Sequence, residues 1–336
     1  MKLVLYTPKF FPLVGGLERV TMEWADALHQ AGHSIWVITT TANPEADRAA
    51  YTIVRNATAG EQLEVLKNVD AVLCMNISLK ALPLLLRSRK QLIISHHTLL
   101  TDGKFKFQMR QQLKLWISNH FARLNICCSA FVARSLKRTV VIHSPYDTNI
   151  FFDQQLPRPK GSILFVGRLV SDKGVQTLLQ AMVMVKRKYD GPVKLTICGD
   201  GPDKEGLVAF VVAHQLQDLV TFKGNLAQSA VAELMNTHRV LVVPSTVEPF
   251  GTVVPEGLAC GCTVICSNTG GLPEAAGSFA VLTPPHDAEQ LALQIVEKLD
   301  RPQVAPTPQL SAHLQQLSVG HSVQQLMLAI NSIRKI

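Results

Sequence analysis

Two acids and two cations in the second half of the chain have the types and spacing that suit binding of an anionic ligand. Glu248 and Glu256 stand eight residues apart and bracket a polar loop after the apolar run 240–243, and Arg168 and Lys173 stand five residues apart after another apolar run. Carboxylates accept hydrogen bonds from hydroxyl groups, and fixed cations stabilise negative charge that develops on a leaving group. Solvated surface charges, or a helix-capping role for Glu256, are the alternatives that spacing leaves open.

Two strand ends in the first half carry further residues that suit ligand contact. Gly15 and Gly16 stand between an expected strand and an expected helix, where backbone amides can approach an anion. His96 and His97 end another expected strand. Successive strand residues face opposite ways, so one histidine can face a ligand while the other points into the fold. A simple tight turn and a structural histidine are the alternatives.

The elements that place these residues alternate between short apolar runs and helix-like stretches. We expect strands at 3–7, 34–40, 51–55, 71–75, 91–96, 124–128, 139–143, 163–166, 194–198, 220–222, 240–243, 263–266 and 280–283. Helices are expected at 17–31, 104–120, 173–188, 203–215, 287–299, 309–317 and 321–335. This alternation predicts an α/β protein with parallel sheets, in which ligands bind at the carboxyl ends of the strands.

The order of these elements breaks once, near the middle of the chain. Residues 144–161 contain three prolines and no regular period, which predicts a linker between two domains. We expect two doubly wound, Rossmann-like domains, 1–150 and 160–305, with an interdomain cleft. A C-terminal helix at 321–336 can pack back on the first domain. Neither half carries G-x-G-x-x-G after its first strand, which disfavours a nicotinamide or flavin cofactor.

The composition argues against membrane-spanning and disulfide-bonded classes. The chain has 336 residues, 47% of them hydrophobic, but no run of 18 apolar residues. Its first residues lead directly into an expected strand, without the pattern of a signal peptide. The seven cysteines form no C-x-x-C pair, which predicts buried thiols in a reducing compartment. We therefore expect a cytoplasmic protein.

Positive charge is concentrated in the first half. Residues 1–150 hold 18 Lys and Arg against 10 Asp and Glu, and 71–146 hold 12 against the single acid Asp102. Within 104–118, apolar residues recur at helical spacing beside basic ones: Phe105, Met109, Leu113, Trp116 and Ile117, with Lys106, Arg110 and Lys114. Such a helix either lies on an anionic membrane surface or packs its apolar side on the sheet. No nucleic-acid-binding motif accompanies the charge, so nucleic acid is not an expected partner.

The sequence from Glu248 to Glu256, E-P-F-G-T-V-V-P-E, resembles the E-x7-E signature of retaining GT-B glycosyltransferases of the group-1 (family four) class. The resemblance continues through G-L-A-C-G-C-T-V-I and G-G-L-P-E, and the stretch 167–174 is similar to the family's G-R-L-x-x-x-K-G motif. It implies an enzyme that transfers a sugar from a nucleotide-diphosphate donor to a hydroxyl acceptor with retention of anomeric configuration.

The resemblance also implies roles for individual residues. Arg168 and Lys173 would bind the donor phosphates, Glu256 the ribose hydroxyls and Glu248 the transferred sugar. His97 would lie near the anomeric centre, and with Glu248, Arg168 and Lys173 it forms the expected catalytic set. Further donor contacts are expected from Gly15, Gly16, Gly199, Phe222, Lys223, Phe250, Gly251 and Thr252. No cofactor and no metal are expected, because a D-x-D-type ligand set is not found and cations with backbone amides can stabilise the leaving phosphate.

The expected pathway is cell-surface polysaccharide, lipopolysaccharide or glycolipid biosynthesis. The acceptor would then be lipid-linked or a polysaccharide precursor, and the protein peripheral on the cytoplasmic face of the membrane through 104–118. Two alternatives share the fold: a nucleotide-sugar epimerase of the GT-B type and a non-catalytic protein that binds sugar nucleotides. The donor sugar, its base and the linkage are not predicted.

Overall fold

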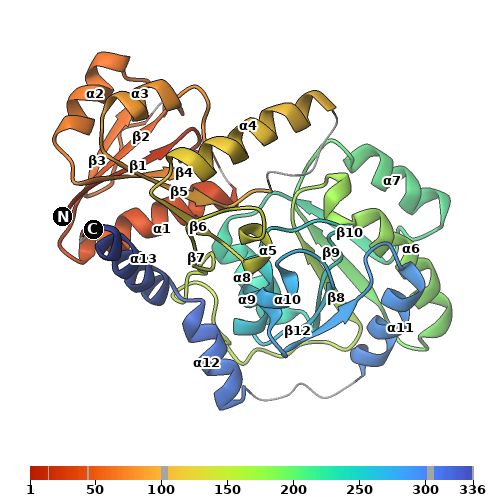
Figure 1. Cartoon of the computed structure of the whole chain (residues 1–336). Coiled ribbons are helices and arrows are strands. Elements are labelled where there is room, and N and C mark those ends of the chain that lie inside the picture. The colour runs from red at the N-terminus through yellow and green to blue at the C-terminus, as the bar shows by residue number, and fades with distance from the viewer. Residues whose placement is uncertain (14, 44, 100–104, 301–305, 335–336) are drawn as a thin grey trace. The chain divides into compact units, whose positions relative to one another are not determined.

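The computed structural model describes the chain except for residues 14, 44, 100–104, 301–305 and 335–336, and except for the side chains of 105–108 and 334 (Figure 1). The chain divides into two compact units. Unit 1 consists of Met1–Pro145 and Ser318–Ile336, and unit 2 of Tyr146–Leu317.

Unit 1 is built on a parallel sheet in the order β3-β2-β1-β4-β5-β6-β7. The strands are β1 (Lys2–Thr7), β2 (Ser34–Thr39), β3 (Thr52–Arg55), β4 (Ala71–Met75), β5 (Gln91–His96), β6 (Leu124–Cys127) and β7 (Thr139–Val141). Side chains of β1 alternate between two cores: Leu3 and Leu5 enter one, and Val4 and Tyr6 the other. The sheet is therefore buried on both faces, as parallel sheets require.

Helices cover both faces of this sheet (Figure 1). They are α1 (Gly16–Gln30), α2 (Ala59–Lys67), α3 (Leu82–Arg87), α4 (Phe105–Phe121), α5 (Ala130–Ala133) and α13 (Val319–Arg334). Trp24 of α1 and Leu326 of α13 share the core of Leu3, whereas Leu66 of α2 and Ile117 of α4 share the core of Val4. The last helix of the chain thus completes the core of unit 1.

Unit 2 repeats the arrangement with a parallel sheet in the order β10-β9-β8-β11-β12-β13. Its strands are β8 (Ser162–Val166), β9 (Lys194–Cys198), β10 (Val220–Gly224), β11 (Val240–Val243), β12 (Thr263–Ser267) and β13 (Ala280–Thr283). Its helices are η1 (Ser171–Lys173, a 3-10 turn), α6 (Val175–Lys188), α7 (Lys204–Ala213), α8 (Gln228–Thr237), α9 (Val253–Ala259), α10 (Leu272–Ala276), α11 (Ala288–Leu299) and α12 (Pro308–Gln316). Helices α6, α7 and α11 pack on one core with β8, while α8, α9 and α10 contact the sheet through β8, β11 and β12.

The predicted fold class, two doubly wound Rossmann-like α/β domains, is confirmed. Every expected strand forms within a few residues of its predicted bounds. The central strands, such as β4 and β11, are short apolar runs that are buried throughout, whereas the outer strands β3, β7 and β10 are only partly buried. Residues 146–161 differ from the expected linker. They form no helix or strand but belong to unit 2, where Phe151 is 1% exposed and Arg158 pairs with Asp153.

The strand orders fix where a ligand can bind in each unit. In unit 1 the order reverses between β1 and β4, and in unit 2 between β8 and β11. Loops that leave such neighbouring strands run in opposite directions, which opens a crevice at the carboxyl ends of the strands. In unit 2, Arg168 and Lys173 follow β8, and Glu248 and Glu256 follow β11. The topology therefore gathers the four charged residues at one reversal point.

Candidate functional site

Lys173 and Glu248 form an ion pair at the carboxyl edge of the unit 2 sheet. Lys173 ends the short turn η1, Glu248 lies in the loop between β11 and α9, and Lys173 Nζ is 2.6 Å from Glu248 Oε2. Their side chains are 17% and 12% exposed, so water screens the pair only in part. Ser245 Oγ donates to the same carboxylate oxygen at 3.2 Å. The structure thus brings together two residues to which the motifs assign separate roles.

Close backbone contacts fix the loop that carries Glu248. Gly270 has φ +59°, and a Cβ there would lie 2.0 Å from the Glu248 carbonyl oxygen. The same carbonyl accepts a hydrogen bond from Gly271 N at 2.9 Å. On the other side, Thr246 N donates to the Asp172 carbonyl at 2.8 Å, which joins this loop to η1. The glycine pair of G-G-L-P-E therefore holds Glu248 by allowing the two loops to touch.

Arg168 lies in the turn after β8 with its side chain exposed to solvent. Among the described residues, its guanidinium makes no hydrogen bond or ion pair. The turn is tight, because Gly199, with φ +134°, brings its Cα so near that a Cβ would lie 1.9 Å from the Gly167 carbonyl oxygen. Arg168 thus presents an exposed positive charge five residues before Lys173, in the segment that follows β8.

The segment from Phe250 to Glu256 leads into α9. Glu256 is 3% exposed and lies in the first turn of this helix, as predicted from Pro255, while Thr252 is the N-cap residue and half-exposed. Phe250 is 2% exposed, and Gly251 is also buried. The ring of Phe250 is therefore part of the packed interior of unit 2.

Phe222 and Lys223 lie on β10, at the outer edge of the same sheet. The Phe222 ring packs against the unit 2 core, whereas Lys223 is exposed. Gly224 lies beside Gly199 at the end of β9, and Gly199 N donates to the Gly224 carbonyl at 2.8 Å. This contact ties the end of β10 to the turn that carries Gly199.

His97 of unit 1 directly follows β5 and is held through both ring nitrogens. His97 Nε2 is 2.8 Å from Ser95 Oγ, and His97 Nδ1 is 3.1 Å from Ser144 Oγ. The backbone N–H of His97 also donates to Asn76 Oδ1 at 2.8 Å. Burial, with a smaller contribution from His96, lowers the pKa of His97 to about 3. Burial thus favours the uncharged form of the ring, which is a weak proton acceptor.

His96 points into the fold. It is 1% exposed, and its Nε2 lies 2.8 Å from Asn125 Oδ1. Burial lowers its pKa to about 4. Asn125 donates in turn to the carbonyls of Ser118 and Lys137, at 3.1 and 2.8 Å. His96 therefore belongs to a buried polar network that joins β5, β6 and α4.

Gly15 and Gly16 lie at the start of α1, after β1. Gly15 is the N-cap residue, without a side-chain hydrogen bond, and Arg19 N donates to its carbonyl. A Cβ on Gly15 would meet the Glu18 carboxylate at 2.4 Å, whereas a Cβ on Gly16 would meet no atom within 4 Å. Space for a ligand thus exists at Gly16, while the residue before this glycine pair, Val14, lies outside the described residues.

Helix α4 packs Ile117 against the sheet but leaves a second row of apolar side chains exposed. Met109, Leu113 and Trp116, spaced by four and three residues, are 62%, 47% and 50% exposed, while Ile117 is 3% exposed. Arg110 is exposed beside them and Lys114 is half-exposed. Of the residues predicted for this amphipathic stretch, Lys104 and the side chains of Phe105 and Lys106 lie outside the described residues.

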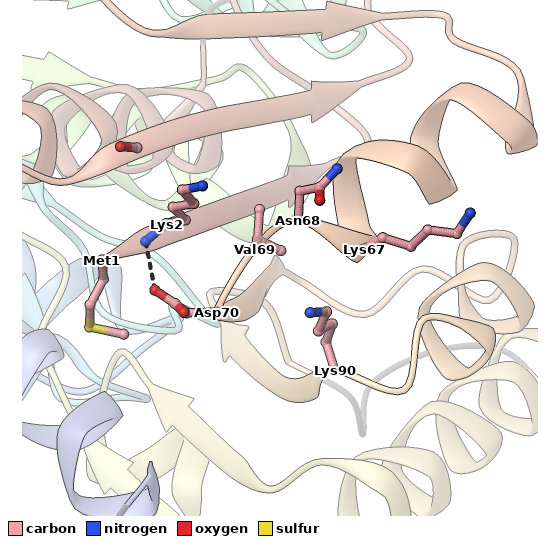
Figure 2. A pocket seen from close by; sticks show the side chains of 8 residues that line it. Met1, Lys2, Lys67, Asn68, Val69, Asp70 and Lys90 are labelled. Atoms are coloured by element: carbon pink, nitrogen blue, oxygen red, sulfur yellow. Dashed lines mark hydrogen bonds between the residues drawn. The ribbon is translucent and has the colours of Figure 1, made fainter.

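An open pocket lies at the opposite edge of the unit 1 sheet, at the amino ends of its strands. Figure 2 shows Lys2, Lys67 and Lys90 around it, with Lys2 N donating to Asp70 Oδ2 at 2.8 Å. The predicted residues of unit 1 follow the carboxyl ends of β1 and β5, so this pocket is separate from them.

The described residues include neither a cluster of metal ligands nor a membrane-spanning helix, and their cysteines are unpaired. Within these ranges, no group of three or more His, Cys, Asp and Glu side chains could hold a metal ion. No helix in the described part of the chain has both the length and the apolar character needed to cross a bilayer. All seven cysteines are described, and they are buried free thiols, as predicted.

Sequence reasoning missed several residues that contact the predicted site residues. Ser95 could have been found, because it lies two positions before His97 and therefore on the same side of the strand. Ser245 stands only three residues before Glu248. Ser144 and Trp24, whose ring lies 5.8 Å from that of His97, give no signal in the sequence, because the fold alone brings them to the histidine.

Comparisons with known protein families cover both units. Residues 147–309 match the family described as glycosyl transferases group 1, and residues 14–149 match the glycosyltransferase family 4 description. The two matched stretches overlap at residues 147–149 and together span residues 14–309.

Individual relatives match over different lengths. Glycogen synthase of Mycobacterium tuberculosis is 34% identical over 145 residues, which are 43% of this chain and 35% of that protein. The phosphatidylinositol N-acetylglucosaminyltransferase gpi3 subunit of Schizosaccharomyces pombe is 25% identical in an alignment 338 positions long, gaps included, which covers 87% of this chain and 72% of the relative. The chain thus aligns with about a third of the length of the glycogen synthase.

Among solved structures, Anabaena HepE in complex with UDP and glucose superposes with a TM-score of 0.80. The superposition covers 99% of this chain and 100% of HepE at 18% sequence identity. At this identity the likeness concerns the fold.

Proposed function

Since this chain belongs to the group-1 glycosyltransferases with the GT-B fold, we propose that it transfers a sugar from a nucleotide-diphosphate donor to a hydroxyl group of an acceptor. The observation that carries the proposal is the group of charges at the reversal point of the unit 2 sheet, where Lys173 pairs with Glu248 beside the exposed Arg168. HepE, whose fold is similar, was solved with UDP and glucose, which supports a nucleotide sugar as donor.

Lys173 and Arg168 supply the charge that the reaction needs. Breaking the bond between the anomeric carbon and the diphosphate leaves additional negative charge on the departing phosphate. The Lys173 ammonium is held in place by Glu248 before a donor arrives, at a distance of 2.6 Å. When the diphosphate binds, it replaces the carboxylate as partner of Lys173, and Glu248 becomes available to accept hydrogen bonds from the sugar hydroxyls.

The remaining donor contacts are proposed from α9, from the loop before it and from unit 1. Glu256, in the first turn of α9, accepts from the ribose hydroxyls, and the amides of Phe250, Gly251 and Thr252 donate to the donor. In unit 1, Gly16 leaves open space at the start of α1. Both ring nitrogens of His97 bond serine hydroxyls, so the ring meets a sugar hydroxyl only by exchanging one of these partners. The lowered pKa of His97 supports a hydrogen-bonding role over proton transfer.

The proposed reaction proceeds with retention of anomeric configuration and without a cofactor or divalent metal. Retention rests on the match of Glu248 and Glu256 to the E-x7-E signature. Metal independence rests on the two cations, which can stabilise the diphosphate by themselves. Activity that persists in excess EDTA is the expected result, and activity restored only by added Mg²⁺ or Mn²⁺ would contradict this part.

The acceptor is proposed to be lipid-linked and to be met at an anionic membrane surface. Support comes from α4, whose exposed Met109, Leu113 and Trp116 lie beside the basic residues Arg110 and Lys114. Apolar side chains that enter the lipid boundary and cations that meet anionic headgroups are the two contributions to such binding. The name of the S. pombe relative, which includes phosphatidylinositol, adds support. The corresponding processes are polysaccharide, lipopolysaccharide or glycolipid synthesis at the cytoplasmic face.

The experiment that tests the transferase function uses defined donors. Purified protein is first screened with UDP-, GDP- and ADP-sugars for thermal stabilisation, because a ligand that binds only the folded state raises its apparent stability. The stabilising donor is then incubated with and without membrane extract. Sugar transfer to the extract supports the proposal. An epimerised donor formed without acceptor would support the epimerase, and binding without any turnover a sugar-nucleotide binding protein.

A further inference from the structure

The C-terminal helix reaches the neighbourhood of His97 through a buried hydrogen bond. Trp24 Nε1, on α1, donates to Ser322 Oγ, on α13, at 2.9 Å. Trp24 is 0% exposed and Ser322 2% exposed, so water does not compete for this bond. Residues 298 positions apart are thus joined within the core of unit 1.

Trp24 in turn contacts the imidazole of His97. The two ring centroids are 5.8 Å apart and the ring planes cross at 66°, which is an edge-to-face arrangement. The hydroxyls of Ser95 and Ser144 bond the two ring nitrogens of His97. These two bonds fix the positions of the nitrogens but leave the ring free to tilt about the line between them. The edge-to-face contact with Trp24 removes that remaining freedom.

Satisfying the buried indole N–H is a sufficient reason for a hydroxyl at Ser322, because an unpaired buried donor is costly. It does not explain why the indole that is fixed in this way lies against His97. Because the Ser322 bond is the hydrogen bond of the Trp24 side chain, it also sets the orientation of the indole, and hence the surface against which the imidazole rests.

We propose that Ser322 is a positioning residue: by holding Trp24, it fixes the tilt of the His97 ring, so that the last helix of the chain helps to build the ligand-binding edge of unit 1. The effect on the ring follows from the contacts alone. The effect on turnover rests on the proposed transferase function.

The test compares histidine ring signals in nitrogen-15 NMR spectra of full-length protein labelled at histidine. His97 is assigned from the signals lost in His97→Asn. In Ser322→Ala the ring signals of His97 are expected to shift, while those of His96, which bonds Asn125 on the other side of β5, stay in place. The matched control is Ser332→Ala, which removes an exposed hydroxyl from the same helix. It should leave both histidines unchanged.

A second variant shows whether the effect travels through the indole. Trp24→Phe removes the N–H, so adding Ser322→Ala to it should cause no further shift of His97. Two results would overturn the inference: unchanged His97 signals in Ser322→Ala, or an equal shift when Ser322→Ala is added to Trp24→Phe. Both outcomes can be read without any enzyme assay, including when Ser322→Ala lowers stability, provided that spectra are taken well below its unfolding temperature.

The kinetic readout separates this inference from the proposed function. With saturating donor, kcat of Ser322→Ala is expected to fall on the order of tenfold with unchanged donor KM, because a misplaced group costs rate more than binding. Shifted His97 signals with wild-type kcat would overturn the positioning role. If the wild-type protein turns over no donor while the signals shift as expected, the proposed function fails and the contact through Trp24 stands.

Discussion

The two units present different chemistry at the carboxyl ends of their strands. In unit 2 that edge carries charge in contact with charge, with Lys173 against Glu248 and Arg168 exposed nearby. In unit 1 the group at the end of β5 is uncharged, because His97 is held between two serine hydroxyls and burial lowers its pKa to about 3. Two sheets of the same kind thus offer different groups to a ligand. Unit 2 offers positive charge to an anion, and unit 1 offers an uncharged histidine held by hydrogen bonds.

The difference follows from what surrounds each group. Lys173 and Glu248 are each the partner of the other, and both side chains stay partly exposed. The ring nitrogens of His97 bond hydroxyl groups and no carboxylate, and burial opposes the charged form. A site that binds and releases a diphosphate needs charged groups such as those of unit 2. A site that orients sugar hydroxyls can use uncharged groups such as His97 of unit 1.

The largest expected effect is on the charged edge. Lys173→Ala should lower kcat about a hundredfold or more, the usual loss for one charge contact in a transition state. Arg168→Ala should act similarly. Lys186→Ala, which removes an exposed lysine of α6 bonded to the Gln215 carbonyl, is the matched control. Steady-state assays with the stabilising donor measure the effect, and near wild-type rates in Lys173→Ala would remove the basis for assigning the reaction to this edge.

The positive charge of unit 1 lies on its surface, and its role can be measured separately. Replacing Leu113 and Trp116 by Ser should weaken binding to phosphatidylglycerol-containing vesicles about tenfold, because two apolar side chains no longer enter the lipid boundary. Leu328→Ser, at a leucine of α13 that is 58% exposed, controls for the loss of any exposed apolar residue. Co-sedimentation gives the bound fraction. Equal binding by the double variant and the wild type would argue against α4 as the membrane contact.

The edge of unit 2 is held by backbone contacts, which makes it sensitive to a single methyl group. Gly270→Ala should lower the free energy of unfolding by about 1–3 kcal/mol, because Gly270 has φ +59° and the new Cβ would meet the Glu248 carbonyl oxygen. Gly206→Ala, in α7, meets no atom within 4 Å and should raise stability by about 0.5–1 kcal/mol. Urea unfolding compares the two. A neutral Gly270→Ala would mean that the loop is free to move.

The smallest expected effect is on the stability of the fold at acidic pH, through the buried histidines His96 and His97. The pKa values of His96 and His97 are lowered to about 4 and about 3, whereas the unfolded chain binds these protons near pH 6.5. Between these values the unfolded state binds more protons, so stability is complete above pH 6.5 and falls as the pH is lowered towards 4. His97→Asn should reduce this fall, and His214→Asn, at an exposed histidine, serves as the control. Thermal unfolding from about pH 7.5 to about pH 4.5 measures it, across the range in which the unfolded state takes up these protons. An unaltered pH dependence in His97→Asn would contradict a lowered pKa of His97 in the folded protein.

The sequence was sufficient for the strands and for the gathering of charged residues, for physical reasons. A strand buried on both faces must be apolar throughout, as 240–243 illustrates, and residues that follow adjacent strands meet at one edge. The motif resemblance assigned Lys173 to the donor phosphates and Glu248 to the transferred sugar. It could not indicate that the two bind each other when no ligand is present, because that pairing depends on the contact between η1 and the loop after β11.

Other features depended on tertiary packing. Helical spacing placed Trp116 and Ile117 in one amphipathic stretch, but only the packed structure distinguishes the exposed tryptophan from the buried isoleucine. The contact from Ser322 to Trp24 spans nearly the whole chain. A local pattern cannot predict such a contact, because the sequence holds no period that relates the two positions.

The claim on which the account rests is that the two cations of unit 2 bind the donor diphosphate without a divalent metal. Isothermal titration of the stabilising nucleotide sugar, in excess EDTA, tests it directly with wild type and Arg168→Ala. The account predicts the same affinity for wild type in EDTA and in Mg²⁺, and a loss of about tenfold or more in Arg168→Ala, the scale of one charged hydrogen bond. Binding that needs Mg²⁺ and is unaffected by Arg168→Ala would contradict it.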